Sequence, residues 1–594
     1  MKKLFFILLG LAYYLLIQLT IVENTEKNTQ TNTFSFMLHS KIPQQVTLYV
    51  GAGRVYIQSI QCDDQNISFP KRQWQWFETM GEQTSFFLKK GDTSCIASMQ
   101  DAKYTLRPVV KQKLTFLNYS ILFLLIGLPL FQFLFKGFIW ALDKIKNKTK
   151  HENTFTIASK QKLQTTLPLS MLFILFLGIG IRILYFQKFG VMNFQHDWQG
   201  HIEFIKYIAN HWNFPSPSHG LEYPQQPLYY LITASVYTIA IKLGFSMMET
   251  YTYIGYVSLL SSFVFLYYGS KFLVLMTENR WTQVTSMLFL ALTPSIVYLS
   301  ARINNDALVM ALASFSLYYI VKSYKSAFQI DFYKALVGVS LLFMTKISAV
   351  PLELLFFALL IFVYLQLNPE KQTKPLLSMQ KKFYIFGVIG LFLIGFTLLR
   401  VYLPIENTFH MVNSSGSFPK QIIHTFNTSY FGTFNIDKLI HKGYSYIFGE
   451  DAIRYSFVTY QYGTMFFGEF GYSSFIKNHT ILKEVMQSIL LFGLVYILGF
   501  ISYIARLFYA SMLQKLLFVT LLLNFLLILK FMFSYPVICN TDFRYFVPSF
   551  VLFAYIFSQG LTTISLNKWV KYLLSICIGM LAISEILFFG LLLT

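Results

Sequence analysis

Apolar runs of about 20 residues recur along almost the whole of this chain and limit what it can fold into more than any other feature. Such a run crosses a hydrocarbon core about 30 Å thick when it forms an α-helix, which satisfies its backbone polar groups internally. The composition agrees, because 55% of the residues are hydrophobic and only 13% are charged. Soluble globular domains carry about 25% charged residues. The sequence therefore predicts an α-helical polytopic membrane protein.

The apolar runs predict about 13 transmembrane helices. They cover residues 4–22, 117–141, 168–186, 251–275, 282–300, 306–322, 332–346, 349–366, 383–403, 485–506, 515–534, 545–563 and 569–590. Every loop that this count turns inward contains Lys or Arg, as the positive-inside rule requires. Residues 224–244 are therefore predicted to form a helix at the outer surface, because a span there would invert every later loop. The Lys and Arg residues that give the net charge of +21 fall mainly in short loops, where they set the orientation of the chain in the membrane. No nucleic-acid partner is therefore expected.

The first 115 residues combine an apolar run with a strand-like segment. Residues 1–22 fit a cleaved signal peptide or a retained anchor, and we favour the anchor because no small-residue cleavage site is evident. Residues 23–115 show strand-like alternation broken by turn residues, which predicts a small external β domain. Cys62 and Cys95 lie there, on the side of the membrane where a disulfide persists. Two free thiols are the alternative.

Four further divisions follow from the same pattern. We expect a transmembrane helix and a basic cytoplasmic loop at 116–164, a core of spans at 165–403 with an outer loop at 187–250, an external segment at 404–484 and C-terminal spans at 485–594. The segment at 404–484 is rich in Tyr, Phe, Gly and Ser, which suits a folded cap that contacts sugar or peptide. A structured loop without that role is the alternative.

A polar stretch at residues 193–231 interrupts this lipid-soluble chain after the third predicted span. Carboxylates and imidazoles resist burial in hydrocarbon, so a cluster of them at a membrane boundary is a candidate site. Apolar residues recur at helical spacing from Trp198 to Trp212, which predicts an amphipathic interfacial helix. Asp197 stands at the amino end of this helix. Its alternatives are a chemical role and a helix cap.

Three histidines of the same stretch are candidate metal ligands, namely His196, His201 and His219. Their irregular spacing favours hydrogen-bonding or interfacial roles over metal binding. Carboxylates and imidazoles are available, but no closed ligand set is visible. The sequence therefore requires no cofactor and leaves dependence on a divalent metal ion open.

Other polar side chains fall on the same predicted outer face. They are Arg302, Asn304, Asn305 and Asp306 between two spans, Lys346 at the end of the seventh span, and Asp542, Arg544 and Tyr545 before the twelfth. Helix capping or snorkelling explains any one of them equally well. Their shared side suits an anionic lipid-phosphate substrate and a nucleophile that must lose a proton.

At these residues the sequence resembles the GT-C glycosyltransferases, especially the protein mannosyltransferase and aminoarabinose transferase families, which use polyprenyl-phosphate sugars. The similar elements are Asp197, the amphipathic helix after it, QQPLYYL at 225–231, RINNDAL at 302–308 and FRYFVPS at 543–549. Together they cover residues 165–594. Gln226 stands where the family commonly has Pro, and Trp198 follows Asp197 in place of a second acidic residue. The identity of the sugar therefore stays open.

The resemblance implies a GT-C-like fold and an inverting transfer from a polyprenyl-phosphate sugar. It carries the role of general base or acceptor-positioning group to Asp197. Donor phosphate contacts are expected from Arg544, Lys346 and Arg302. Further residues expected to bind or support substrate are His196, His201, Glu222, Tyr229, Asn305, Asp306, Glu469 and Tyr545.

The external β domain suggests a macromolecular acceptor, either an exported protein such as a pilin or an envelope glycan or lipid. The expected location is the outer face of a bacterial inner membrane. A lipid or solute transporter is the alternative from another class, and it would place polar residues at mid-membrane within broken helices. A non-catalytic assembly protein is a third interpretation.

Overall fold

The structure is a computed structural model of the chain. It describes residues 20–23, 33–41, 44–51, 56–62, 65–68, 82–88, 91–100, 109–113, 121, 123–148, 166–191, 197–215, 222–329, 331–366, 373–398, 428–442, 456–468, 480–534, 541–564 and 567–593. The chain divides into two compact units. The first unit combines Met1–Thr154, Lys206–Gln225 and Leu367–Gly416, and the second combines Phe155–Ile205, Gln226–Gln366 and Ser417–Thr594.

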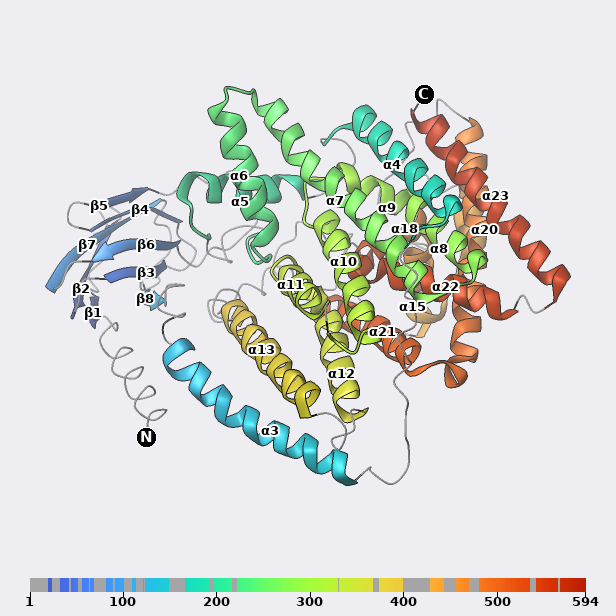
Figure 1. Ribbon diagram of the computed structural model, residues 1–594. Helices are drawn as coiled ribbons and strands as arrows, with labels where there is room; N and C mark the ends of the chain where they lie inside the picture. Colours follow the sequence, from blue (N-terminus) through green and yellow to red (C-terminus); the bar gives the residue numbers. More distant parts are fainter. Residues whose placement is uncertain are drawn as a thin grey trace. The chain divides into compact units, whose positions relative to one another are not determined.

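The first unit contains a β domain, drawn in blue in Figure 1. Its strands are β1 (Thr20–Glu23), β2 (Thr33–Ser40), β3 (Gln44–Gly51), β4 (Tyr56–Cys62), β5 (Gln65–Ser68), β6 (Glu82–Leu88), β7 (Gly91–Gln100) and β8 (Val109–Lys113). They form two antiparallel sheets, in the orders β1-β2-β7-β4-β5 and β6-β3-β8. Most of the predicted span at 4–22 lies outside the described residues. Its last residues, from Thr20 onward, are in strand β1 rather than in a helix.

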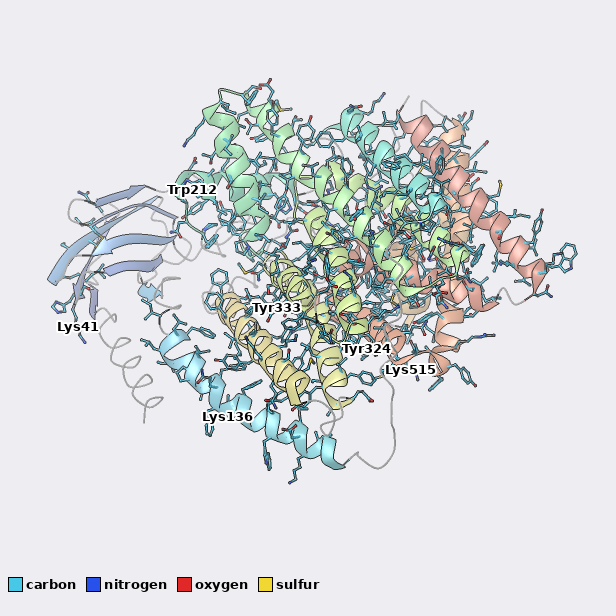
Figure 2. The ribbon with its side chains drawn as sticks, viewed as in Figure 1. Lys41, Lys136, Trp212, Tyr324, Tyr333 and Lys515 are labelled. Carbon is cyan, nitrogen blue, oxygen red and sulfur yellow. A yellow bond between two sulfur atoms is a disulfide. The ribbon has the colours of Figure 1, made fainter. Side chains whose placement is uncertain are left out.

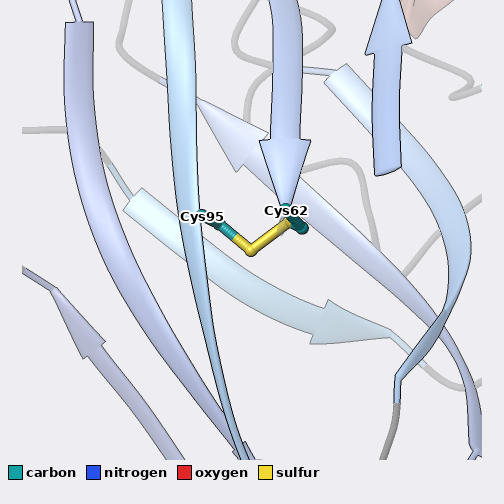
Figure 3. The surroundings of a disulfide bond; sticks show 2 residues. All are labelled: Cys62 and Cys95. Atoms are coloured by element: carbon teal, nitrogen blue, oxygen red, sulfur yellow. A yellow bond between two sulfur atoms is a disulfide. The ribbon is translucent and has the colours of Figure 1, made fainter. Parts of the chain in front are cut away.

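A disulfide joins two neighbouring strands of the larger sheet. Cys62 of β4 and Cys95 of β7 are direct partners in the register, and their sulfur atoms are bonded (Figure 3). Both are buried, as is Leu38 of β2, whereas the adjacent residues Met37 and Ile96 are exposed. This alternation shows that the disulfide lies on the covered face of the sheet, where successive side chains point to opposite sides.

The first unit also contains helical segments that pair with each other. These are η1 (Phe123–Gly127), α3 (Leu128–Lys148) and α13 (Thr373–Thr397). Gln132 of α3 donates to the Tyr384 hydroxyl of α13 at 2.9 Å. Gly387 allows close approach, because a Cβ there would lie 2.4 Å from the Phe131 ring. Helix α5 (Trp198–His211) contains residues of both units.

The second unit is a bundle of helices. They are α4 (Leu169–Phe189), α6 (Leu228–Lys242), α7 (Met247–Met276), α8 (Arg280–Leu292), α9 (Pro294–Tyr298), η3 (Leu299–Ala301), α10 (Asp306–Lys325), α11 (Phe332–Phe343), η4 (Ile347–Ala349), α12 (Val350–Gln366), α15 (Thr428–Gly432), α16 (Ile436–Lys442), α18 (Phe457–Phe467), α20 (Thr480–Ala505), η9 (Leu507–Tyr509), α21 (Met512–Ser534), η11 (Phe543–Ser549), α22 (Phe550–Ile564) and α23 (Lys568–Leu593). The predicted external segment 404–484 is described only at α15, α16, α18 and the start of α20.

Ten helices among the described residues are long and apolar enough to cross a membrane, or up to 11 if a bent pair is one span. The predicted class, a helical multi-pass membrane protein with a small β domain near the N-terminus, is confirmed. Of the 13 predicted spans, the one at 4–22 lies mostly outside the described residues, and the other 12 compare with these ten or 11 helices. The predicted span 282–300 is bent by 52°, and the predicted span 332–346 forms a helix of only 12 residues. That helix, α11, extends about 18 Å, which is too short to cross alone.

The bend between α8 and α9 is supported by a buried arginine. Pro294 begins α9 and lacks an N–H, so the Leu290 carbonyl loses its usual helical donor. Arg182 of α4 has no exposed surface and donates to the carbonyls of Leu290 at 2.9 Å and Ala291 at 2.8 Å. It also donates to Gly178 of its own helix at 3.1 Å. The arginine thus compensates carbonyls at the end of α8 while the chain changes direction.

Helix α6 is shorter than a membrane-spanning helix, and helix α7 is longer. The 15 residues of α6 extend about 22 Å, and the 30 residues of α7 extend about 45 Å. Ser258 of α7 donates to the Arg302 carbonyl, just before α10 begins. Ser258 is therefore level with the start of α10. The residues of α7 that precede Ser258 extend past that start, and so does α6, which joins them. The helix expected at 224–244 is present as α6, and its place at the membrane surface stays a prediction.

We expect Arg182→Met to destabilise the second unit. The substitution removes the donors to two carbonyls of α8, and each unsatisfied buried group costs about 1–3 kcal/mol. Thermal denaturation of the full chain in detergent measures the loss. Leu184→Met, on the exposed side of the same helix, is the matched control. Equal midpoints for the two variants would contradict the role of Arg182.

Candidate active site

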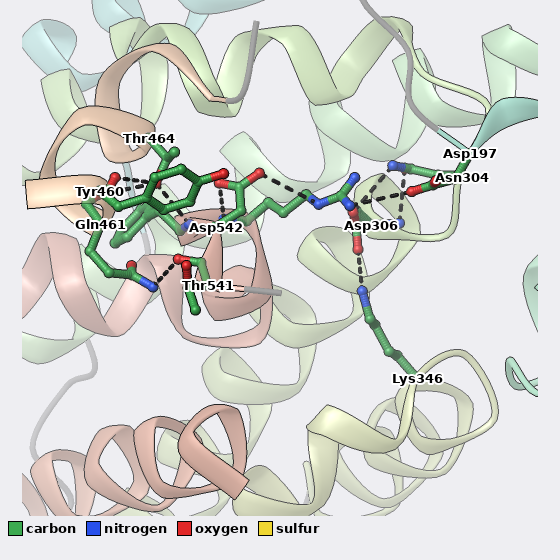
Figure 4. A network of polar contacts seen from close by, with 11 residues as sticks. Asp197, Asn304, Asp306, Lys346, Tyr460, Gln461, Thr464, Thr541 and Asp542 are labelled. Carbon is green, nitrogen blue, oxygen red and sulfur yellow. Dashed lines mark hydrogen bonds and ion pairs between the residues drawn. The ribbon is translucent and has the colours of Figure 1, made fainter. Parts of the chain in front are cut away.

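Asp197 occupies a strained turn directly before α5. It adopts φ 61°, in the left-handed region that non-glycine residues rarely enter. Its carbonyl accepts from the N–H of His201 at 3.2 Å, which begins the helix. Its side chain is 36% exposed and reaches Arg544, with Oδ2 at 3.4 Å from Nη2. Asp197 therefore begins the helix through its backbone while its carboxylate meets a cation from a distant part of the chain (Figure 4).

Arg544 lies between two carboxylates. Asp542 accepts from the Arg544 backbone N–H at 3.1 Å, and its Oδ2 lies 3.5 Å from Arg544 Nε. The Arg544 guanidinium also stacks over the Tyr545 ring at 5.3 Å. The helical turn η11 that holds these residues is fixed to α18, because the Phe543 N–H donates to Thr464 Oγ1 at 3.1 Å. These contacts fix the guanidinium in the turn η11, before α22.

Asp306, the first residue of α10, binds a second cation. Lys346 Nζ lies 2.5 Å from Asp306 Oδ1, and Asn304 donates to Asp306 Oδ2 at 3.2 Å. Asn305 donates to the Thr345 carbonyl at 3.2 Å, beside Lys346. The beginning of α10 is therefore held to the segment before η4 by an ion pair and by a hydrogen bond from a side-chain amide.

Aromatic rings connect the two ion pairs. Lys346 and Arg544 both lie over the Tyr545 ring, at 5.6 Å and 5.3 Å from its centre. Arg302 lies 5.4 Å from the centre of the Tyr298 ring and interacts electrostatically with Asp306. The charged groups consequently form one cluster rather than isolated pairs.

His201 lies against the same cluster as a neutral side chain. Burial lowers the pKa of His201 to about 3, although Asp197 and Asp306 oppose the shift. Its Nδ1 is hydrogen-bonded to the Tyr230 hydroxyl at 2.8 Å. Tyr229 is fully buried, and its phenol lies near Ser258. These side chains support the cluster without adding charge.

The cluster contains three carboxylates and three cations. They are Asp197, Asp306 and Asp542, with Arg302, Lys346 and Arg544. Burial raises the pKa of Asp542 to about 6, against the opposing attraction of Arg544. Asp197 is the most exposed member, since its side chain is 36% exposed and those of Arg544 and Lys346 are 10% and 13% exposed. The arrangement therefore offers one accessible carboxylate beside cations that are only slightly exposed.

The structure brings most of the predicted site residues together. Those in or beside the cluster are Asp197, His201, Tyr229, Arg302, Asn305, Asp306, Lys346, Arg544 and Tyr545. His196 and Glu469 lie outside the described residues. Glu222 is buried and belongs to the first unit, so it is not assigned to the cluster.

Sequence reasoning did not select four side chains of this region as site residues, namely Tyr230, Tyr298, Asn304 and Asp542. Asn304 and Asp542 stand within the polar elements that the sequence singles out, so their proximity to Asp306 and Arg544 was the available signal. Tyr298 carried none, because it lies inside an apolar run. Among the described residues, no group of three or more His, Cys, Asp or Glu side chains is arranged to hold a metal ion.

No protein-family model and no curated protein sequence matches this chain. Two solved structures of sugar transferases are similar to it. The protein O-mannosyltransferase Pmt1–Pmt2 complex of S. cerevisiae, bound to its sugar donor, has a TM-score of 0.31 and 13% identity, over 44% of this chain and 39% of that one. Arabinosyltransferase EmbB from Mycobacterium smegmatis has a TM-score of 0.42 and 8% identity, over 95% of this chain and 52% of that one.

The chain thus spans 39% and 52% of the lengths of these two proteins. With TM-scores below 0.5, neither superposition assigns a role to any residue here.

A double-mutant cycle separates the structural part of the cluster from its chemistry. Lys346→Met should remove the cation that directly contacts the buried Asp306 carboxylate, and breaking such a pair from one side costs about 3–5 kcal/mol. Adding Asp306→Asn removes the unpaired charge, so the double variant should recover most of the lost stability. Thermal denaturation of all four proteins tests this. Additive losses in the double variant would show that the pair is not coupled.

Proposed function

We propose that this protein is an integral-membrane glycosyltransferase of the GT-C type that uses a polyprenyl-phosphate sugar as donor. The observation that carries the proposal is the accessible carboxylate of Asp197, held 3.4 Å from the guanidinium of Arg544. A base for an acceptor hydroxyl and a cation for a departing phosphate are the two groups that this transfer needs. The sequence resemblance independently assigns these roles to the same two positions.

In the proposed reaction, Asp197 accepts the proton of the acceptor hydroxyl. The acceptor oxygen forms a bond to the anomeric carbon as the bond between that carbon and the phosphate oxygen breaks. The electron pair leaves with the lipid phosphate, and attack from the opposite side inverts the anomeric configuration. A positioned base contributes about 10²- to 10⁴-fold to such a step.

Arg544 stabilises the leaving phosphate in this mechanism. Its planar guanidinium offers paired N–H donors to phosphate oxygens, and Asp542 and Tyr545 hold it from the protein side. When the donor phosphate engages Arg544, the Asp197 carboxylate exchanges its cation for the acceptor hydroxyl. Without substrate, the Asp197–Arg544 ion pair thus takes the place of the contacts that each side chain makes with substrate in the reaction.

Lys346 supplies a second positive charge near the phosphate, because it shares the Tyr545 ring with Arg544. Arg302 has a more distant part. Only 2% of its surface is exposed, so it acts through its electrostatic attraction for Asp306 and Asp542 rather than by touching the donor. Asp306 and Asn304 hold Lys346 and the start of α10 in position.

The proposed acceptor is an exported protein such as a pilin, or an envelope glycan or lipid, on the outer face of a bacterial inner membrane. An external β domain near the N-terminus supports a macromolecular acceptor. A transporter is less well supported, because the charged groups of the Asp197–Arg544 cluster lie at helix ends, including the start of α10 and the turn before α22.

Asp197→Asn tests the base. The amide keeps the size of the side chain and most of its capping ability but removes its negative charge and its basicity. We expect an inserted, stable protein that still binds donor and transfers sugar at least about 10²-fold more slowly. The measurement is transfer from a purified lipid-phosphate sugar. Glu249→Gln, an exposed carboxylate at the head of α7, is the control. Near-normal transfer by Asp197→Asn would return this residue to a structural role.

Arg544→Lys tests phosphate recognition. Lysine preserves the charge but cannot reproduce bidentate contacts with a phosphate. We expect a raised KM for the donor and slower transfer in Arg544→Lys, with a larger loss in Arg544→Ala. Arg506→Lys, at an exposed position after α20, should behave as the unchanged protein. Unaltered donor dependence in both Arg544 variants would remove Arg544 from the mechanism.

A further inference from the structure

The segment that carries Lys346 also carries a serine hydroxyl whose hydrogen-bonding capacity is unused. Residues 344–348 lead from the end of α11 into η4, and Lys346 has extended backbone there, with φ −159° and ψ 131°. Figure 4 shows Lys346 with its ion pair. The Thr345 hydroxyl donates to the Leu341 carbonyl at 2.8 Å. The Ser348 hydroxyl, by contrast, is buried and forms no hydrogen bond within the described part of the chain.

Two asparagines hold the backbone of this segment. Asn305, directly before α10, donates to the Thr345 carbonyl at 3.2 Å. Asn524 of α21 donates to the Ser348 carbonyl at 3.3 Å. Both carbonyls flank Lys346, so the same two contacts that fix the backbone around this cation also fix the place of the Ser348 hydroxyl.

Asn524 itself is an exception on the buried face of α21. Asn524 follows Lys515, which Figure 2 labels near the start of this helix. The buried residues of α21 are Leu513, Leu517, Thr520, Leu521, Asn524, Ile528 and Met532. Asn524 has no exposed surface, and its Oδ1 has no hydrogen-bond partner among the described residues. A buried polar atom without a partner destabilises a fold, so folding alone does not explain an asparagine at this position.

The two unsatisfied atoms lie beside one hydrogen bond. Asn524 Oδ1 belongs to the amide that donates to Ser348, and Ser348 Oγ belongs to the residue that accepts. Oδ1 only accepts hydrogen bonds, whereas the serine hydroxyl can both donate and accept. A ligand hydroxyl can therefore donate to Asn524 Oδ1 and accept from Ser348 Oγ at the same time. A phosphate oxygen without a proton cannot satisfy Oδ1, so the pair of atoms favours a hydroxyl over an anion.

The position of these atoms selects the donor sugar as the source of the hydroxyl. Lys346, two residues before Ser348, supplies positive charge near the phosphate in the proposed reaction. The sugar is bonded directly to that phosphate, so its hydroxyls lie beside the phosphate-binding cations.

The subsite can open with small movements. Ser348 as a residue is only half-buried, and Ile347 before it is 41% exposed. The serine hydroxyl turns by rotation about a single bond between staggered positions. The bond from Asn524 to the Ser348 carbonyl is long, at 3.3 Å, so a slight outward shift of α21 admits a ligand hydroxyl between the two side chains.

We propose that Ser348 and Asn524 bind one hydroxyl of the donor sugar. This subsite rests on the proposed function, because it requires a lipid-phosphate sugar held by Lys346 and Arg544. The cations bind the phosphate, and the two uncharged side chains bind the sugar. A donor that presents a hydroxyl at this place is held more tightly than one that lacks it, so the two side chains contribute to the choice of sugar.

The test compares lipid phosphates with and without a sugar, bound to the purified full chain in neutral detergent and measured by native mass spectrometry. The probes are undecaprenyl phosphate and its mannosyl, glucosyl, galactosyl and arabinosyl derivatives. The unchanged protein should bind at least one glycosylated probe more tightly than the lipid without sugar. Ser348→Ala and Asn524→Leu should each weaken binding of that probe about five- to tenfold, because each removes one hydrogen bond to the sugar. Binding of undecaprenyl phosphate itself should not change.

Thr520→Val is the matched control on the same face of α21. It removes a hydroxyl that donates to the Leu516 carbonyl of its own helix at 2.8 Å, so it should bind every probe as the unchanged protein does. Thermal denaturation without added lipid establishes that each variant is folded. Ser348→Ala should not lower the midpoint, because it removes a buried atom that bonds to no described residue.

Three results would overturn the subsite. The first is equal affinity of the unchanged protein for the lipid with and without sugar, and the second is unchanged affinity for the glycosylated probe in either variant. The third is weaker binding of undecaprenyl phosphate in Ser348→Ala, because the hydroxyl would then contact the phosphate. Arg544→Ala separates these results from the proposed function. If that variant alone loses undecaprenyl phosphate, the phosphate site stands and the subsite fails, whereas unaltered binding of every probe by Arg544→Ala would overturn both.

Discussion

The pairing of buried charges around Asp306 and Arg544 is the constraint on which the second unit depends. Burying an isolated ion costs several kcal/mol even after the protein relaxes, so each charge needs a partner at short range. Lys346 and Asp542 meet this need at 2.5 Å from Asp306 and 3.5 Å from Arg544. Lys346 also lies over the Tyr545 ring of η11, so the start of α10, the segment before η4 and the turn η11 must meet at fixed separations. The same constraint that positions three segments also leaves Asp197 accessible beside a cation.

The bend between α8 and α9 positions one side of the charged cluster. The contacts that fix it come from several helices. Arg182 compensates carbonyls at the end of α8, and Ser295 Oγ of α9 donates to the Met465 carbonyl of α18. Gly468, which ends α18 with φ 63°, lies against Tyr298, and a Cβ there would come within 2.5 Å of that ring. Tyr298 in turn supports the Arg302 guanidinium. A glycine distant in the sequence thus makes room for the ring under a cluster cation.

Local pattern was enough to predict the helices, the β domain and the polar positions, because hydrophobic periodicity and turn residues act over short distances. The local pattern could not predict which carboxylate pairs with which cation. Lys346 and Asp306 are 40 residues apart, and Arg544 and Asp197 are 347 apart, so only packing decides that they meet. The bend in 282–300 had a visible signal in Pro294, since proline breaks a helical hydrogen bond. The prediction counted only the length of each apolar run, so it missed this bend. For the same reason it treated α11 as a full span.

The start of α10 shows how a charged cluster can accept a ligand without leaving a charge unpaired. Three carboxylates and three cations are matched there, so a ligand that enters replaces an existing partner. Asp197, with a side chain that is 36% exposed, is the member that can change partner most easily. The fully paired Asp306 and Asp542 keep the cations in place during such an exchange, because breaking a buried pair from one side costs about 3–5 kcal/mol. This arrangement suits the proposed sugar transfer, in which Asp197 leaves Arg544 for the acceptor hydroxyl and returns to it after each reaction.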